Sequence, residues 1–182
     1  MRIVSGKFRA KKLAPPTHNI RPTLDKVKQS LFTKLQFFVE GSKVLDLFCG
    51  SGALGIEAIS RNASRVVFCD NNEKSIALTK KNIASLKLEN SKTEISVIKN
   101  DYKTFLENTK ESFDLIIIDP PYESDFYYPA LALIKSKKLL APGGVIVCER
   151  LKSRHITQDL FENTDTKIYG SVALDYFEEK PE

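Results

Sequence analysis

The stretch "KVLDLFCGSGALG", residues 43–55, joins an apolar, β-branched run to a turn that is rich in glycine. The run has the composition of a buried strand, and Gly50, Gly52 and Gly55 have the spacing G-x-G-x-x-G. Glycine at these positions lets the backbone turn sharply from a strand into a helix and lets a ligand approach the main chain closely. The stretch therefore predicts the first strand, turn and helix of an α/β fold that binds a cofactor. A tight turn without a ligand is the alternative.

Two acidic residues indicate which cofactor such a turn would hold. Asp70 ends the next apolar run, where its carboxylate can accept hydrogen bonds from both hydroxyls of a ribose. Asp46 lies four residues before the first glycine, where it would repel the pyrophosphate of a dinucleotide. The same charge would favour a cofactor with a cationic end, such as S-adenosylmethionine with its ammonium and sulfonium groups. We therefore expect S-adenosylmethionine at this turn.

Five short apolar runs alternate with segments of helix length along the chain. The runs are residues 43–48, 65–70, 94–98, 113–119 and 144–149. Nearly continuous apolar composition of this kind is typical of parallel strands that are covered on both faces. Two further strand-like runs meet at Gly170 without room for a helix between them. The pattern predicts a doubly wound α/β fold, a mostly parallel, Rossmann-like sheet of seven strands with a C-terminal antiparallel hairpin.

The stretch "IIIDPPYESD", residues 116–125, stops its own strand. Pro120 and Pro121 remove two backbone donors, so the strand must end at Asp119. The end of this fourth strand lies beside the end of the first in a doubly wound sheet, so Asp119 should face the crevice that holds the reactive end of the cofactor. Its carboxylate and the nearby carbonyls can orient the exocyclic amine of a base toward a methyl group, while Tyr122 stacks on the ring. A strand stop without a chemical role is the alternative.

A second acid follows the third strand, in "KNDYKTFL", residues 99–106. Asp101 can accept a hydrogen bond from the amino group of an adenine, and Tyr102 beside it offers an apolar surface. Asp101 is equally suited to cap the helix that begins at Tyr102. The sequence leaves both interpretations of Asp101 open.

The charge of the chain is concentrated at its N-terminus. Residues 1–43 hold ten Lys and Arg against two acidic residues, a net charge of +8, whereas the rest of the chain carries −3. This asymmetry indicates an anionic partner such as a nucleic acid, with a solvated lysine-rich tail as the alternative. "RIVSGKFRAKKL", residues 2–13, predicts a small exposed hairpin because basic and apolar residues alternate around Gly6.

A helix is predicted over residues 21–35, with Pro22 in its first turn and most of its lysines in water. Its apolar stripe consists of Leu24, Val27, Leu31 and Leu35. We expect residues 1–40 to form a basic hairpin-and-helix extension that packs on the body. Residues 41–182 then form the cofactor-binding domain.

The composition argues against several classes of protein. The three cysteines match neither a zinc site nor a disulfide framework, so we expect small core residues in a reducing compartment and no metal. No apolar run approaches the ~18 residues of a membrane span, and the basic N-terminus lacks an apolar signal core. We expect a cytoplasmic protein and, because coiled-coil heptads are missing, a monomer.

The motifs together resemble a known family. "DLFCGSGALGIEAISR", "VVFCD" and "IIIDPPY" are similar to the class I S-adenosylmethionine-dependent methyltransferases that modify amino groups. "RIVSGKFRAKKL" followed by "RPTLDKVKQSLF" resembles the bacterial 16S ribosomal RNA guanine-N2 methyltransferases of the RsmD type. The resemblance covers nearly the whole chain. It implies transfer of a methyl group from S-adenosylmethionine to N2 of one guanine in 16S ribosomal RNA, within the small subunit or an assembly intermediate.

The resemblance and the residue patterns together assign roles to particular positions. The candidates for binding the cofactor are Asp46, Phe48, Gly50, Ser51, Gly52, Asp70, Asn71, Asp101 and Tyr102. The candidates for receiving the guanine are Asp119, Pro120, Pro121 and Tyr122. The candidates for RNA contact are Arg2, Lys7, Arg9, Lys11, Lys12, Arg21 and Thr23.

The sequence departs from the family pattern at a few positions. Cys49 stands where alanine is usual, and Ala10 replaces the glycine common in the N-terminal hairpin. Other functions stay open alongside the implied one. They are a DNA adenine-N6 or protein-glutamine methyltransferase, a nicotinamide-dependent oxidoreductase, and an RNA-binding assembly factor without turnover.

Overall fold

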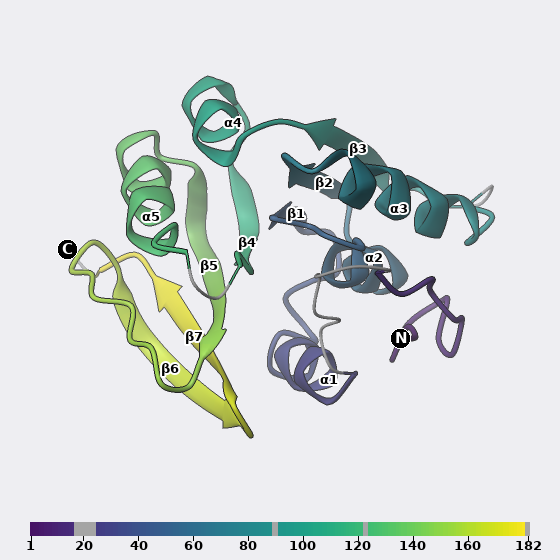
Figure 1. The fold of residues 1–182 in the computed structure, drawn as a ribbon, viewed down its shortest axis with the longest axis horizontal. Coiled ribbons are helices and arrows are strands. Elements are labelled where there is room, and N and C mark those ends of the chain that lie inside the picture. Colours follow the sequence, from purple (N-terminus) through teal and green to yellow (C-terminus); the bar gives the residue numbers. More distant parts are fainter. Residues whose placement is uncertain (17–24, 89–90, 122–123, 181–182) are drawn as a thin grey trace.

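The computed structural model of the protein describes residues 1–16, 25–88, 91–121 and 124–180. Its strands are β1 (Lys43–Leu47), β2 (Arg65–Asp70), β3 (Glu94–Lys99), β4 (Phe113–Ile118), β5 (Leu140–Leu151), β6 (Glu162–Tyr169) and β7 (Val172–Glu178). They form one sheet in the order β3-β2-β1-β4-β5-β7-β6 (Figure 1). The first five strands are parallel, and β7 runs antiparallel to both of its neighbours. The predicted Rossmann-like sheet with a C-terminal hairpin is confirmed.

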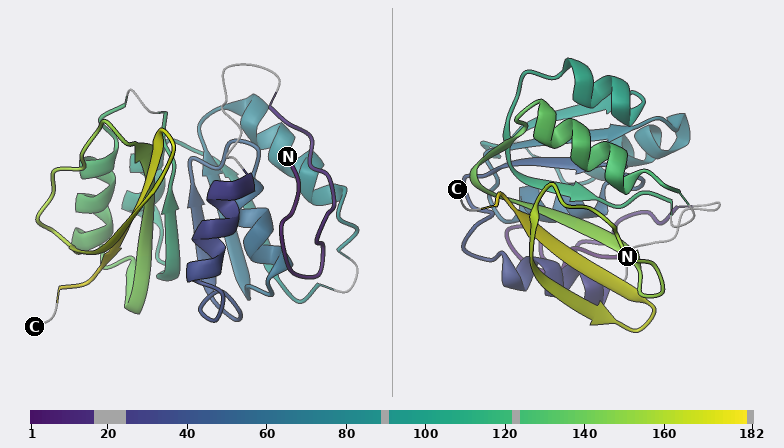
Figure 2. Two further views of the ribbon diagram at one scale, coloured as in Figure 1. Left: turned by 90° about the horizontal axis from the view of Figure 1, so that it is seen from below. Right: turned by 90° about the vertical axis from the view of Figure 1, so that its left-hand side faces the viewer.

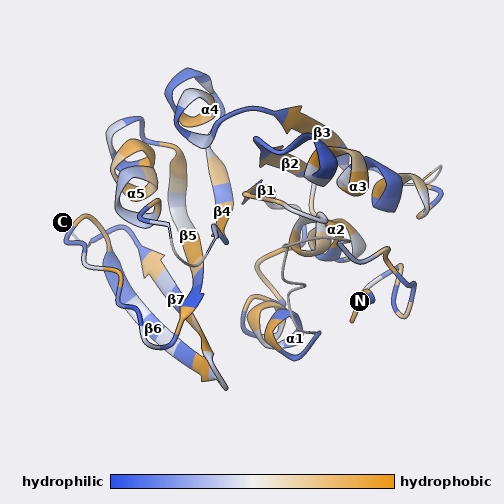
Figure 3. Ribbon diagram, viewed as in Figure 1, coloured by the Kyte–Doolittle hydropathy of each residue, from blue (hydrophilic) through white to orange (hydrophobic). Residues whose placement is uncertain are grey.

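Helices cover both faces of this sheet, as the apolar character of its strands requires. The helices are α1 (Asp25–Lys34), α2 (Ala53–Ser60), α3 (Glu73–Ala84), α4 (Tyr102–Asn108) and α5 (Tyr127–Ser136). The first three pack into one apolar core and the last two into a second core on the opposite face (Figures 1 and 2). Figure 3 shows apolar residues in the central strands and hydrophilic segments along β6 at the edge. The loops that follow the parallel strands therefore meet at the carboxyl edge of the sheet, where these strands end and the helices of both faces begin.

The fifth strand is longer than its sequence pattern indicates. The expected run 144–149 lies inside β5, which begins at Leu140 and ends at Leu151. Its second half pairs with β7 from Ile146 to Leu151, so the antiparallel partner extends the strand beyond its apolar residues. The two C-terminal strands turn at Gly170, whose φ of 61° is the left-handed conformation that glycine adopts without strain.

The N-terminal segment, residues 1–13, is named the arm here. An antiparallel bridge joins Arg2 and Lys12, and next to it Ile3 donates to the carbonyl oxygen of Lys11 and accepts from the N–H of Ala10. The predicted hairpin is confirmed, and its basic side chains are exposed, whereas Ile3 and Leu13 are buried in the core of α1 to α3. A Cβ on Gly6 would lie 1.9 Å from the carbonyl oxygen of Ser60, so the turn of the arm rests directly on the end of α2.

Helix α1 confirms the predicted stripe in its described part, since Val27, Leu31 and Leu35 are buried. Leu24 and Pro22 lie outside the described residues. Lys26 and Lys34 are exposed, as expected for most of the lysines. Lys28 is fully buried, donates to the carbonyl oxygen of Arg2 and lies 3.9 Å from Glu57. Burial lowers the pKa of Lys28, and the negative charge of Glu57 opposes that shift. The buried carboxylate of Glu57, on α2, therefore supplies the opposite charge that lets Lys28 be buried.

Candidate functional site

The turn after β1 has the conformation that its glycines allow. Gly50 and Gly52 have φ values of 54° and 75°, and Gly52 is the N-cap of α2. Phe48 also has a positive φ, 72°, which is unusual for an aromatic residue. A Cβ on Gly55 would lie 2.3 Å from the ring of Phe68, so the third glycine is needed for close packing of α2 on β2. Residues 48–52 are named the glycine loop below.

Asp46 lies beneath the glycine loop and is only 1% exposed. Its Oδ2 accepts a hydrogen bond of 2.8 Å from the backbone N–H of Gly55. Burial raises the pKa of Asp46 from 3.8 to about 7, the Gly55 bond opposes the rise, and the nearby charge of Asp70 adds to it. The side chain therefore holds the start of α2 in place. The attraction of Asp46 for a cationic cofactor stays a prediction. The strength of that attraction depends on how far Asp46 is ionised near neutral pH.

Asp70 lies at the end of β2, beside the glycine loop. Its Oδ2 accepts from the N–H of Gly50 at 2.9 Å, and its Oδ1 accepts from the N–H of Asn72 at 2.8 Å. These bonds aim the half-buried carboxylate across the loop. Each oxygen has a second lone pair, so the arrangement leaves capacity for the ribose contact that the sequence predicts. Asn71 is exposed next to it.

Two side chains of α3 fasten the glycine loop, and the sequence interpretation missed both. Thr79 Oγ1 donates to the carbonyl oxygen of Gly50 at 3.0 Å. Asn82 Nδ2 donates to the carbonyl oxygen of Ser51 at 3.0 Å, and Asn82 Oδ1 accepts from the N–H of Ala14 at 2.8 Å. Both are buried together with Ser75, at the spacing of one helix face. A polar stripe among the apolar residues of this helix was the available signal.

Asp101 is the N-cap of α4 in the structure. Its Oδ1 accepts from the N–H groups of Lys103 and Thr104 at 2.9 and 3.3 Å. The capping interpretation is therefore confirmed, and a contact with adenine stays a prediction.

Three aromatic rings gather where β1 ends and where α4 and α5 begin. Phe48, Tyr102 and Phe126 have ring centroids 5.0 to 5.8 Å apart, and the rings of Phe48 and Phe126 are nearly parallel at 9°. Phe126 was not among the predicted site residues, although it follows the Asp119 turn by only a few positions. The cluster gives the carboxyl edge of the sheet a flat, apolar surface suited to a planar ring.

The Asp-Pro-Pro turn begins where β4 ends, at Ile118. Asp119 is half-buried and Pro120 is buried, whereas Pro121 is exposed and its carbonyl oxygen accepts from the N–H of Ser124 at 2.9 Å. Tyr122 lies outside the described residues, so its stacking role stays a prediction. The predicted end of the strand is confirmed.

The glycine loop and the Asp119 turn follow strands that pair directly. Leu47 is in register with Ile118, so Phe48 and Asp119 come next on adjacent strands. From β1 the sheet continues to β2 and β3 on one side and to β4 and β5 on the other. In open α/β sheets, ligands bind in the crevice at such a switch point. The structure thus brings the predicted cofactor loop and the predicted substrate acid together.

The basic residues of the arm differ in their freedom to bind RNA. Lys7, Arg9 and Lys12 are exposed. Arg2 pairs with Asp25 at 3.3 Å, and Lys11 Nζ donates to the carbonyl oxygen of Leu86 at 3.0 Å. Arg2 therefore also joins the arm to α1, and Lys11 joins it to the segment after α3. The other two candidates, Arg21 and Thr23, lie outside the described residues.

Helix α2 joins the arm to the glycine loop through Glu57. This fully buried carboxylate accepts from the N–H groups of Val4 and Ser5, each at 2.9 Å, and from Arg61 Nε at 3.1 Å. Ser60 adds bonds to the backbone of the arm. The arm is therefore built onto the helix that begins at the cofactor loop. The division into residues 1–40 and 41–182 stays a prediction.

Cys49, Cys69 and Cys148 are buried free thiols, as predicted. Burial raises the pKa of all three, to about 12 for Cys69. Among the described residues, no group of three or more His, Cys, Asp or Glu side chains is placed to hold a metal ion. No helix in the described part of the chain has the length and apolar character needed to cross a membrane.

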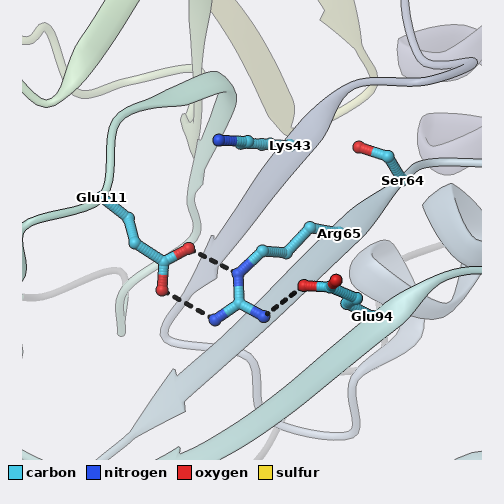
Figure 4. A pocket seen from close by; sticks show the side chains of 5 residues that line it. All are labelled: Lys43, Ser64, Arg65, Glu94 and Glu111. Carbon is cyan, nitrogen blue, oxygen red and sulfur yellow. Dashed lines mark hydrogen bonds and ion pairs between the residues drawn. The ribbon is translucent and has the colours of Figure 1, made fainter.

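A pocket of about 500 Å³ opens at the opposite edge of the sheet (Figure 4). It is lined by Lys43, Ser64, Arg65, Glu94 and Glu111. Arg65 donates to both carboxylate oxygens of Glu111 and lies 3.4 Å from Glu94. This edge is where β1, β2 and β3 begin, whereas ligands of such sheets bind where the strands end. The pocket is therefore an ion-paired hollow away from the candidate site.

Known proteins are similar to this chain in sequence and in fold. The family model described as Conserved hypothetical protein 95 matches residues 1–178. A "Ribosomal RNA small subunit methyltransferase D" from Haemophilus influenzae is 34% identical and spans 95% of this chain and 91% of that protein. The protein of the same name from Buchnera aphidicola subsp. Acyrthosiphon pisum is 33% identical, over 85% of this chain and 80% of that protein.

A solved structure described as "Putative methyltransferase yhhF from Escherichia coli" has a TM-score of 0.85 at 28% identity. The match covers 100% of this chain and 99% of that chain. It includes the N-terminal arm as well as the sheet. The chain therefore belongs to the Conserved hypothetical protein 95 family, the RsmD family of small-subunit ribosomal RNA methyltransferases, as its motifs predicted.

Proposed function

We propose that this protein transfers a methyl group from S-adenosylmethionine to the exocyclic N2 amine of a guanine in 16S ribosomal RNA. The observation that carries the proposal is the pairing of β1 with β4, which sets the glycine loop beside Asp119. Membership of the RsmD family supports the substrate, because relatives in that family are called small-subunit ribosomal RNA methyltransferases. The RNA is bound within the small subunit or one of its assembly intermediates.

The residues at the carboxyl edge fit the cofactor by their chemistry. Asp70 offers acceptors for the ribose, and the aromatic cluster of Phe48, Tyr102 and Phe126 offers an apolar surface for the adenine. Gly50 and Gly52 bring the backbone close to the methionine part. Asp46 lies beneath, where its ionised form stabilises a cation. When bound, S-adenosylmethionine supplies a methyl group on a cationic sulfur that leaves as a neutral thioether.

Asp119 orients the nucleophile. The lone pair of a guanine amine is delocalised into the ring, so the amine attacks poorly unless it is positioned. The Asp119 carboxylate and the Pro120 carbonyl accept the two N2 hydrogens and direct the lone pair toward the methyl carbon. With the cofactor bound, N2 would take the methyl group as the thioether leaves, and the resulting cationic amine would give one proton to water or to Asp119. Positioning therefore supplies most of the catalysis.

The arm supplies the RNA contacts through its exposed Lys7, Arg9 and Lys12. Phosphate contacts of this kind position the substrate without reading its sequence. Because Glu57 and Ser60 fasten the arm to α2, RNA held by the arm is also held at a defined place relative to the glycine loop. We further propose that the protein acts as a monomer in the cytoplasm, a reducing compartment suited to its three free thiols.

The variant Asp119→Ala tests this assignment. We expect its affinity for S-adenosylmethionine, measured by calorimetry, to stay within a few-fold of the wild-type value while turnover on small ribosomal subunits falls by at least about 100-fold. Asp159→Ala is a matched control for removal of a carboxylate outside the site. Turnover that survives in Asp119→Ala would remove Asp119 from the mechanism.

A further inference from the structure

The end of β5 carries a buried carboxylate that the mechanism above does not use. Glu149 is only 4% exposed, and glutamate is rarely buried to this extent. Its backbone carbonyl accepts a hydrogen bond of 2.7 Å from Tyr127 Oη. That bond joins the end of β5 to α5 and fixes the backbone of β5 at Glu149.

The strand register places Glu149 beside Asp119. Ile118 of β4 is in register with Cys148 of β5, so the next pair along these parallel strands is Asp119 and Glu149. Glu149 itself pairs with Leu174 of β7. The two acids therefore occupy neighbouring positions at the carboxyl edge of the sheet.

The alternation of side chains puts both acids on the same face. Ile117 and Val147 belong to the core on the side of α1, α2 and α3. Glu149, two positions after Val147 within β5, points to that side as well, because side chains alternate along a strand, and Asp119 follows the same alternation as the first residue after β4. Leu174, the cross-strand partner of Glu149, belongs to the same core. The glycine loop leads into α2 on this face, so the pair lies on the side of the cofactor loop.

The surroundings hold the pair in place. Tyr127 lies close to both acids, since its pKa is raised mainly by burial and then by the charges of Asp119 and Glu149. Arg154 donates to the carbonyl oxygen of Ser124 at 3.3 Å and to Asp125 at 2.8 Å. The segment after the Asp119 turn is thereby fastened next to the end of β5.

We propose that Glu149 determines the specificity for guanine by accepting the hydrogen of the ring nitrogen N1, while Asp119 accepts a hydrogen of N2. The inference rests on the proposed function and says how the guanine of the substrate is recognised. Guanine presents N1–H and N2–H₂ as adjacent donors, which match two carboxylates side by side. Adenine presents an acceptor at N1 next to its amine, so a carboxylate at that place repels it.

A base analogue separates this recognition from general activity. 2-Aminopurine keeps the reacting amine of guanine but has an acceptor lone pair at N1 in place of N1–H. Small subunits are reconstituted with 16S RNA that carries either guanosine or 2-aminopurine riboside at the nucleotide that the wild-type enzyme methylates. We expect the wild-type enzyme to prefer guanosine by roughly 100-fold in kcat/KM, because a buried carboxylate would face the lone pair.

The variant Glu149→Gln should lose this preference. Its amide can accept from N1–H or donate to the N1 lone pair, so we expect the two substrates to differ by less than about tenfold. Glu162→Gln on the exposed edge strand β6 is the matched control and keeps the wild-type ratio. Because Glu149 does not contact the cofactor in this account, affinity for S-adenosylmethionine stays within about threefold of wild type, which also shows that the variant is folded.

An unchanged ratio in Glu149→Gln would overturn the inference. A wild-type enzyme whose kcat/KM on the 2-aminopurine subunits lies within about tenfold of its value on the guanosine subunits would overturn it as well. This comparison uses only the wild-type enzyme, so it holds even if the variant does not fold. A wild-type enzyme that forms no N2-methylguanosine on the guanosine subunits would overturn the proposed function itself, and the inference with it.

Discussion

The substitution Asp46→Asn should stabilise the protein above neutral pH and weaken its hold on the cofactor. Asp46 is buried beneath the glycine loop, where its carboxylate accepts one bond, from the N–H of Gly55. An asparagine side chain has nearly the same shape and keeps an oxygen for that bond. The variant cannot ionise, so the part of the stability difference that depends on pH reports the cost of a charge at this place.

The pKa of Asp46 gives the direction and the size of the effect. Below pH 3.8 the group is protonated in both the folded and the unfolded chain and contributes nothing. Between pH 3.8 and about 7 the folded protein keeps a proton that the unfolded chain has lost, so the free energy of unfolding falls as pH rises. Each pKa unit corresponds to 1.36 kcal/mol, so the ionised form costs about 4 kcal/mol above pH 7. A weaker bond from Gly55 to the neutral amide offsets about 1 kcal/mol.

Urea unfolding of both proteins at pH 5 and pH 8 measures this cost. We expect the Asp46→Asn variant to exceed the wild-type protein by about 3 kcal/mol at pH 8 and to show a much smaller advantage at pH 5. Other groups titrate in both proteins and cancel in the difference. At pH 8 the variant should also bind S-adenosylmethionine more weakly, because the cationic end loses an ionised partner. A difference in stability that does not change between the two pH values would refute the reasoning.

Three further substitutions probe the arm and its attachment. Ala10→Gly should raise the free energy of unfolding by about 0.5–1 kcal/mol, because Ala10 has a φ of 69° that glycine adopts without strain; thermal unfolding checks this. Glu57→Gln should cost about 3 kcal/mol in urea unfolding, since it removes the buried carboxylate beside Lys28 and leaves only the partly exposed Asp25, and a loss below about 1 kcal/mol would contradict that. The double variant Arg9→Ala, Lys12→Ala should weaken binding to 16S RNA. The number of counterions released, read from the slope of log Kd against log salt concentration, should fall by about one to two, and an unchanged slope would place the RNA surface elsewhere.

Much of the candidate site could be predicted because its signals are local. The glycine loop, the end of β4 at two prolines and the acid at the end of β2 each follow from a few adjacent residues. The apolar strands were recognisable because a sheet covered on both faces needs continuous apolar residues. The position of the fourth strand beside the first then followed from the rules of doubly wound sheets.

The features that could not be predicted depend on contacts between distant segments. Lys28 is buried because Glu57, on another helix, carries the opposite charge. Thr79 and Asn82 serve the glycine loop because α3 packs beside it, and β5 is long because β7 pairs with its end. The proposed role of Glu149 in binding guanine depends on the strand register that places it next to Asp119. In each case the decisive neighbour lies many residues away.

Identification of the methylated nucleoside tests the proposed reaction itself. Labelled S-adenosylmethionine is incubated with the protein and small ribosomal subunits that lack guanine-N2 methylation, with free 16S RNA and duplex DNA in parallel, and the products are digested and identified by mass. The account predicts N2-methylguanosine from the ribosomal sample, reduced to background with Asp119→Ala. N6-methyladenine, or no methylated guanosine from RNA in either form, would contradict it.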